Sequence, residues 1–232
     1  MSWSRPWYMR FVSPSRLDEY LQYISGKDFK GDDFTANMYI DKLLKIEEPT
    51  SRRKADAGTA CHLVLEKSDH GKSISKCTAN VDSKVWSIDW QLDADIYVPT
   101  SREQWIHSYV CDELIIGKVD AIDATSVHDH KFTSYVDIEK YIMSMQWKLY
   151  LLMTKKDAFV YNIFSVEVLE HYDAVIVKSY DKLELYRYKA MSEQVLDTLS
   201  DYIKFLKAIK EALSYRIQQY NQQSNIKIKE IF

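Results

Sequence analysis

Two carboxylates and a lysine lie close together in this sequence, and they are its residues best suited to chemistry. Asp120 follows Gly117-Lys-Val, and Asp129 precedes His130 and Lys131. Two acids held near one another repel unless a proton or a cation lies between them, and hard divalent cations prefer oxygen ligands. A neighbouring lysine can stabilise negative charge on a phosphate. The segment therefore indicates metal-assisted phosphoryl chemistry.

Two further pairs of polar residues have a spacing that suits the same site. His62 and Glu66 are four residues apart in a segment with a helical pattern, which places them on one face of that helix. Gln146 and Tyr150 have the same spacing in a later segment. Each of these residues, taken alone, is more often part of a core or of a solvated surface than of a site. Their order and spacing together point to chemistry.

The hydrophobic pattern predicts the helices and strands that would position these residues. We expect helices over 13–26, 37–46, 57–67, 137–153 and 192–217. We expect strands over 84–98 (with a turn near 91–93), 114–122, 126–132, 158–169, 173–178 and 182–189. This order predicts an α/β fold class with a central mixed β-sheet and helices on both faces. It predicts one domain over 1–232, with a helical segment 1–56, a core 57–190 and a C-terminal helix 191–220.

Strand geometry relates the two carboxylates. Asp129 and Lys131 are two residues apart on one strand, so both side chains point to the same face while His130 points away. If the strands 114–122 and 126–132 pair antiparallel through the turn at 123–125, Asp120 and Asp129 become near neighbours at one end of the sheet.

Composition and charge narrow the class of protein. The chain has 232 residues, 46% of them apolar, which is enough to bury a core. A net charge of -3 weighs against a non-specific DNA-coating protein, whereas a local pair such as Arg52-Arg53 can contact a substrate or lie on the solvated surface.

Three cysteines fit neither a disulfide framework nor a zinc site with paired cysteines, so we expect free thiols and a cytoplasmic protein. The pattern predicts neither a signal segment nor a membrane span.

The ordered motifs resemble the RecB-like branch of the PD-(D/E)XK nuclease superfamily. The resemblance covers roughly 11–190. It rests on five segments: Ser13-Pro-Ser-Arg-Leu17 at the N-terminal start, Gly58-Thr59…His62…Leu65-Glu66, Gly117-x-x-Asp120, Asp129-x-Lys131 and the branch-specific Gln146-x-x-x-Tyr150. The resemblance implies a restriction-endonuclease-like core.

The resemblance also implies metal ligands. His62, Asp120, Asp129 and the backbone carbonyl of His130 would bind Mg²⁺ or Mn²⁺, and the imidazole favours tolerance of Mn²⁺. Glu66 would orient a metal-bound water or support a second ion.

For the remaining residues, the resemblance implies contacts with water and substrate. Lys131 would position or activate the attacking water and stabilise the developing charge. Gln146 and Tyr150 would hold the DNA strand or the lysine, and Arg52 and Arg53 would add basic contacts to the substrate.

Two departures from the branch are informative. Many members hold an iron–sulfur cluster with four cysteines, but here no cysteine follows Cys111, so we expect no cluster. No phosphate-binding loop of a helicase is present either.

We therefore expect a metal-dependent DNA exonuclease for phage-type recombination or DNA end processing. Its substrate would be linear DNA ends, and a single-strand annealing protein would be a partner. The alternatives are a structure-specific endonuclease or junction resolvase on the same fold, and a non-catalytic DNA-binding module. The C-terminal helix would either pack on the core or serve as an interface in a homo-oligomer.

Overall fold

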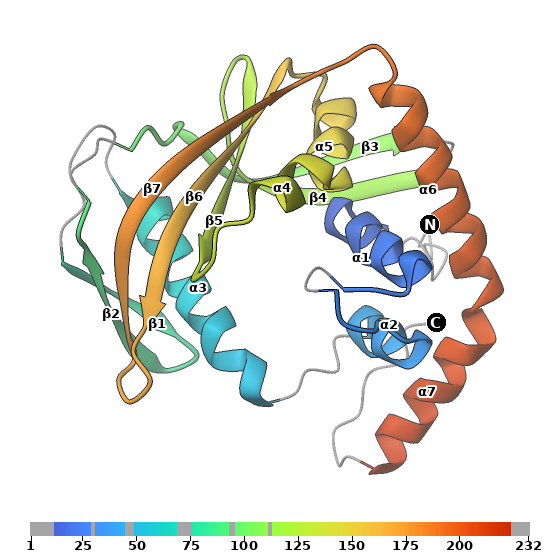
Figure 1. Cartoon of the computed structure of the whole chain (residues 1–232), viewed down its shortest axis with the longest axis horizontal. Helices are drawn as coiled ribbons and strands as arrows, with labels where there is room; N and C mark the ends of the chain where they lie inside the picture. The colour runs from blue at the N-terminus through green and yellow to red at the C-terminus, as the bar shows by residue number, and fades with distance from the viewer. Residues whose placement is uncertain are drawn as a thin grey trace, which may run out of the picture.

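The computed structural model contains one seven-stranded sheet with helices on both faces (Figure 1). It describes residues 12–28, 31–44, 49–68, 76–92, 96–110 and 113–223. The helices are α1 (Pro14–Ser25), α2 (Ala36–Leu43), α3 (Pro49–Lys67), α4 (Ile138–Met143), α5 (Met145–Thr154), α6 (Met191–Ala208) and α7 (Lys210–Gln223). The strands are β1 (Cys77–Val81), β2 (Lys84–Trp90), β3 (Ser101–Val110), β4 (Glu113–Ile122), β5 (Ser126–Thr133), β6 (Ala158–Val168) and β7 (Ala174–Tyr186).

The sheet is mixed, with the strand order β1-β2-β7-β6-β5-β4-β3. The pairs β2–β7 and β5–β6 are parallel, and the other neighbouring pairs are antiparallel. Each face has its own apolar core: α3 packs on one face with Trp86 and Phe164, and α1, α5 and α6 pack on the other with Phe159 and Ile163. β6 supplies both cores, which explains its nearly continuous run of apolar residues. The predicted fold class is confirmed.

Several predicted boundaries were wrong. No strand was predicted over β1 or over β3, and the strand expected over 84–98 ends at Trp90. The two strands expected over 173–189 are one long strand, β7. The pattern of β3 is hard to recognise because Trp105 and Tyr109 lie on its exposed face while the polar Gln104 and Ser108 lie on the opposite face, so the usual alternation of apolar and polar residues is missing.

The helix expected over 137–153 is broken at Ser144, whose backbone is extended (φ −57°, ψ 140°). Asp18 of α1 holds this break, since its carboxylate accepts hydrogen bonds from the Ser144 hydroxyl and the Met145 backbone N–H, both at 2.5 Å. The Ser144 Oγ in turn accepts the Gln146 N–H at 3.1 Å and caps α5. The break lets α5 start in a new direction, with Gln146 in its first turn.

Two further helices also differ from their expected bounds. α3 begins at Pro49 rather than Ala57, and the last helix is interrupted at Ile209. Within the described residues, no helix is both long and apolar enough to cross a bilayer.

The strands β4 and β5 pair antiparallel for only a short distance before they part. Their register contains Ala121↔His128 and Ile122↔Val127, after which β4 continues with β3 while β5 continues with β6. Figure 1 shows β3 and β4 running away from the curved β5–β7 part of the sheet. Asp120 lies at the point where the strands part, as the predicted pairing through the 123–125 turn requires.

The close approach of α5 to β4 depends on a glycine. A Cβ added at Gly117 would lie 2.7 Å from Cε1 and 2.9 Å from the hydroxyl of Tyr150. The same hydroxyl donates a hydrogen bond to the Lys118 carbonyl at 2.7 Å. Tyr150 therefore occupies the space above Gly117 and fixes β4 against α5.

Replacing Gly117 by alanine should lower the free energy of unfolding by about 1–3 kcal/mol, because the added methyl group clashes with the buried Tyr150 ring. The matched control is Gly58→Ala in α3, where an added Cβ meets nothing within 4 Å. That variant should be more stable by about 0.5–1 kcal/mol, because alanine favours the helix. Urea unfolding measures both, and equal effects would contradict the role of Tyr150.

Candidate active site

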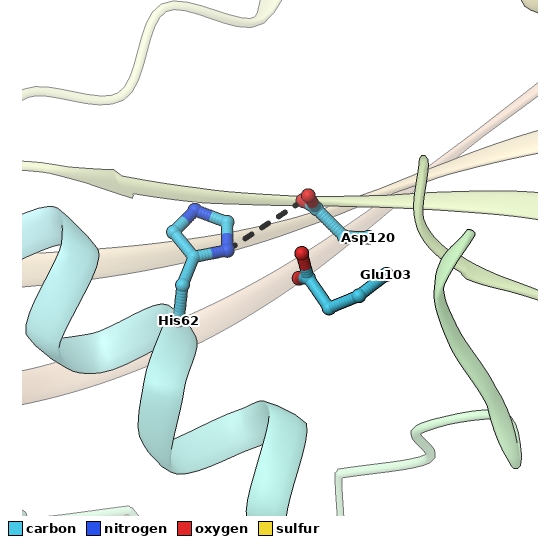
Figure 2. A group of neighbouring side chains, drawn as sticks. All are labelled: His62, Glu103 and Asp120. Carbon is cyan, nitrogen blue, oxygen red and sulfur yellow. Dashed lines mark ion pairs between the residues drawn. The ribbon is translucent and has the colours of Figure 1, made fainter. Parts of the chain in front are cut away.

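Three side chains from three different elements meet beside the point where β4 and β5 part. His62 comes from α3, Glu103 from β3 and Asp120 from β4, and one ligand atom of each lies within 4.8 Å of the others (Figure 2). The Nδ1 atom of His62 is 3.7 Å from Oδ2 of Asp120. One imidazole and two carboxylates are a donor set that suits Mg²⁺ or Mn²⁺.

The parting of the strands gives Asp120 a hydrogen bond from the backbone. The N–H of His130 donates to Oδ2 of Asp120 at 2.6 Å, so a backbone group released from strand pairing is satisfied by this side chain. The bond holds the Asp120 carboxylate against β5, next to Asp129.

Glu103 is a member of this group that the sequence analysis missed. It lies opposite Asp120 in the β3–β4 register, between the pairs Arg102↔Ala121 and Gln104↔Val119. Its φ of +54° falls in the left-handed region, which is strained for a residue with a side chain. Lys118 forms an ion pair with its carboxylate. A strand prediction over 101–110 would have placed Glu103 on the same face as Trp105, but only the pairing register places it opposite Asp120.

A second group lies on the β5 side of the opening. Nζ of Lys131 is 2.8 Å from Oδ2 of Asp129. The Gln146 amide joins the two: its Nε2 donates to Oδ1 of Asp129 at 3.3 Å, and its Oε1 accepts from Nζ of Lys131 at 3.4 Å. Gln146 therefore links the Asp129 carboxylate to the Lys131 ammonium group. It can do so only because the first turn of α5 faces β5.

The electrostatics of the carboxylates favour a cation. Burial and, next, the charge of Asp129 raise the pKa of Asp120 to about 8. Oδ2 of Asp129 is buried and, apart from its contact with the Lys131 ammonium, receives no hydrogen bond. A divalent ion would offset the repulsion between the two carboxylates and give Oδ2 of Asp129 a further partner. The residues present therefore fit a metal ion.

The protonation of the basic residues suits the same arrangement. Burial lowers the pKa of His62, so its ring is neutral at pH 7 and has a lone pair for a metal ion. Burial, the largest single effect, would lower the pKa of Lys131, but the charge and hydrogen bond of Asp129 together with Asp120 and Tyr141 outweigh it, and the net pKa is raised. Lys131 is therefore a cation at neutral pH and not a proton acceptor.

Other residues singled out from the sequence have different surroundings. Glu66 is exposed on α3 and lies outside the group of three ligands. Tyr150 is buried and contacts β4 rather than Lys131. Arg52 pairs with Asp82 on the surface.

The guanidinium of Arg53 is occupied near the β6–β7 turn. It donates to Asp173 at 3.2 Å, to the Leu169 carbonyl at 2.9 Å and to the Tyr172 carbonyl. It also lies over the Trp86 ring, 5.4 Å from the ring centroid. These contacts tie α3 to the far end of the sheet.

Comparison with known proteins gives structural likenesses at low identity. No family model matches the chain, and no curated protein matches it. An alkaline exonuclease from Laribacter hongkongensis is similar over 94% of this chain and 98% of its own, with 11% identity and a TM-score of 0.41. A crystal structure described as SSO0001 is similar over 84% of this chain and 75% of its own, with 13% identity and a TM-score of 0.39. At these TM-scores neither structure bears on the chemistry of this chain.

Replacing Asp120 by asparagine should have opposite effects with and without metal. In the presence of a chelator, the variant should unfold at a higher temperature than the wild type. Asparagine needs no proton on folding, whereas the buried Asp120 carboxyl must be protonated or remain charged beside Asp129, and the oxygen that accepts the His130 N–H is kept. With saturating Mn²⁺ the wild type should gain about 2–3 kcal/mol and the variant much less.

The matched control is Asp157→Asn, an exposed carboxylate outside the site, which should leave both measurements unchanged. Thermal unfolding with EDTA, Mg²⁺ and Mn²⁺ checks the order. A wild type that gains nothing from either ion would argue against a metal site here.

Proposed function

We propose that the protein is a metal-dependent nuclease that hydrolyses phosphodiester bonds in DNA. The observation that supports it best is the convergence of His62, Glu103 and Asp120 beside the Asp129–Lys131 pair, where two strands part. Acids and an imidazole that can hold a cation, with an adjacent ammonium group, suit metal-assisted hydrolysis of a phosphodiester.

Each residue would have a distinct task in this reaction. His62, Glu103, Asp120 and Asp129 would hold Mg²⁺ or Mn²⁺, with the His130 carbonyl as a further ligand. When bound, such an ion lowers the pKa of a coordinated water and offsets charge on a phosphate oxygen. Lys131, which stays protonated, would orient the attacking water through hydrogen bonds and stabilise the charge that develops on the phosphate.

Gln146 and Asp129 would keep Lys131 in place for this task. The amide and the carboxylate both contact the lysine head group, which limits its motion before the substrate arrives. We assign Gln146 and Tyr150 positioning roles rather than direct contacts with the reacting atoms. Tyr150 would act through β4, which it fixes by its bond to the Lys118 carbonyl.

We further propose that the enzyme is an exonuclease of the RecB-like branch that processes DNA ends. The motif order in the sequence, including Gln146-x-x-x-Tyr150, favours this over a structure-specific endonuclease. Covalently closed circular DNA separates the two activities, because an exonuclease leaves it intact while it degrades the linearised form.

Replacing Lys131 by alanine should lower the rate of hydrolysis of linear duplex DNA by about 10²- to 10³-fold, because the charge on the phosphate loses its stabilising cation. Substrates labelled at the 5′ or the 3′ end, incubated with Mg²⁺ or Mn²⁺, measure the rate and the direction of digestion. Circular dichroism checks that the variant is folded.

The matched control is Lys204→Ala on α6, an exposed lysine that pairs only with Asp201 three residues away among the described contacts. It should digest DNA at the wild-type rate. Full activity in Lys131→Ala, or no activity in the wild type with either ion, would refute the proposal.

A further inference from the structure

A row of exposed aromatic side chains lies on the outward face of β3. It begins two residues beyond Glu103 and continues toward the C-terminal end of the strand. Trp105 is 70% exposed and Tyr109 is 73% exposed, and His107 between them is exposed as well. Successive residues of a strand point to opposite faces, so these three share the face of Glu103. We call this row, with Lys118 opposite Trp105, the outer hairpin face.

The outer hairpin face is continuous with the candidate active site. In the β3–β4 register, Glu103 lies opposite Asp120, and the next pair on the same face is Trp105↔Lys118. Two residues of a strand span about 7 Å, so Trp105 is the residue next to Glu103 on this face of β3. Lys118 bridges the two, since its ammonium contacts Glu103.

The opposite face of the hairpin packs against the core, whereas Trp105, His107 and Tyr109 belong to neither apolar core among the described residues. Ile106 packs against the core on the α5 side, and Ile115, Gly117 and Val119 of β4 are buried there. Among the described strands, β3 also ends the sheet order. Exposed aromatics on an edge strand invite aggregation, so their presence points to a ligand.

We propose that the outer hairpin face binds a single strand of DNA, with bases stacked on Trp105 and Tyr109. The proposal rests on the proposed nuclease function, because it supplies the strand that enters or leaves the metal site. Aromatic faces stack on any base, and a lysine among them contacts the phosphate backbone. The two rings are about 14 Å apart along β3, so they hold different nucleotides of one strand.

The test measures binding without catalysis. A fluorescent oligothymidylate of about 12 nucleotides is titrated with protein in EDTA, and its anisotropy gives the Kd. Trp105→Ala and Tyr109→Ala should each raise the Kd by about 5- to 150-fold, because each removes one stacking surface. Trp105→Phe keeps an aromatic face and should restore most of the affinity.

Two controls make the test specific. Tyr172→Ala removes an equally exposed tyrosine from the β6–β7 turn, where the side chain is 70% exposed, and should bind as the wild type does. Lys204→Ala on α6, which removes an exposed lysine far from both groups in the sequence, should likewise bind as the wild type does. Wild-type affinity in the Trp105→Ala, Tyr109→Ala double variant, or no binding by the wild type, would overturn the proposal.

The outcomes separate this proposal from the nuclease function. Binding that depends on Trp105 in a protein without hydrolytic activity would support the stacking face and refute the nuclease. Normal hydrolysis with binding that ignores Trp105 would refute the stacking face alone. Sedimentation of the double variant tests the other occupant: a dimer that becomes a monomer, with DNA binding unchanged, would assign the face to a second copy of the chain.

Discussion

The hydrogen bond from the His130 backbone N–H to the Asp120 carboxylate is the contact on which the candidate site depends. It forms because β4 and β5 part after two residue pairs, which leaves a backbone donor of β5 without a strand partner. A buried donor needs an acceptor, and Asp120 supplies it. The same bond holds Asp120 near Asp129. The need of the His130 N–H for an acceptor therefore places two carboxylates side by side, and this arrangement favours a cation.

The surroundings of this bond are organised by contacts between distant segments. Asp18 of α1 caps the start of α5, and α5 then presents Gln146 to β5 and Tyr150 to β4. Gly117 allows the last of these contacts because it has no side chain. Gly117 is far from Gln146 and Tyr150 in the sequence, but the contacts of these residues together fix α5 against β4 and β5. They thereby hold Lys131, Asp120 and Asp129 in their relative positions.

The hairpin β3–β4 links this site to the outer surface. Its inner face belongs to the core, whereas its outer face runs from Glu103 and Asp120 to exposed aromatic rings. The strained backbone at Glu103 lies where the metal-ligand group adjoins the row of exposed aromatic side chains. A single twisted hairpin can therefore supply both ligands for an ion and a surface for a polymer that approaches it.

The sequence by itself determined the fold class and the spacing of the chemical groups. Alternation placed Asp129 and Lys131 on one face, and the short 123–125 turn suggested the antiparallel pairing that brings Asp120 close. These features are local, since they follow from the period of a strand and the length of a turn.

Only the tertiary structure decided the rest. Glu103 joined the site through the register of β3 with β4, and the break at Ser144 arose because Asp18, more than a hundred residues earlier, offered a better acceptor than another helical turn. Such contacts depend on which segments meet in space, and no periodicity in the chain encodes that.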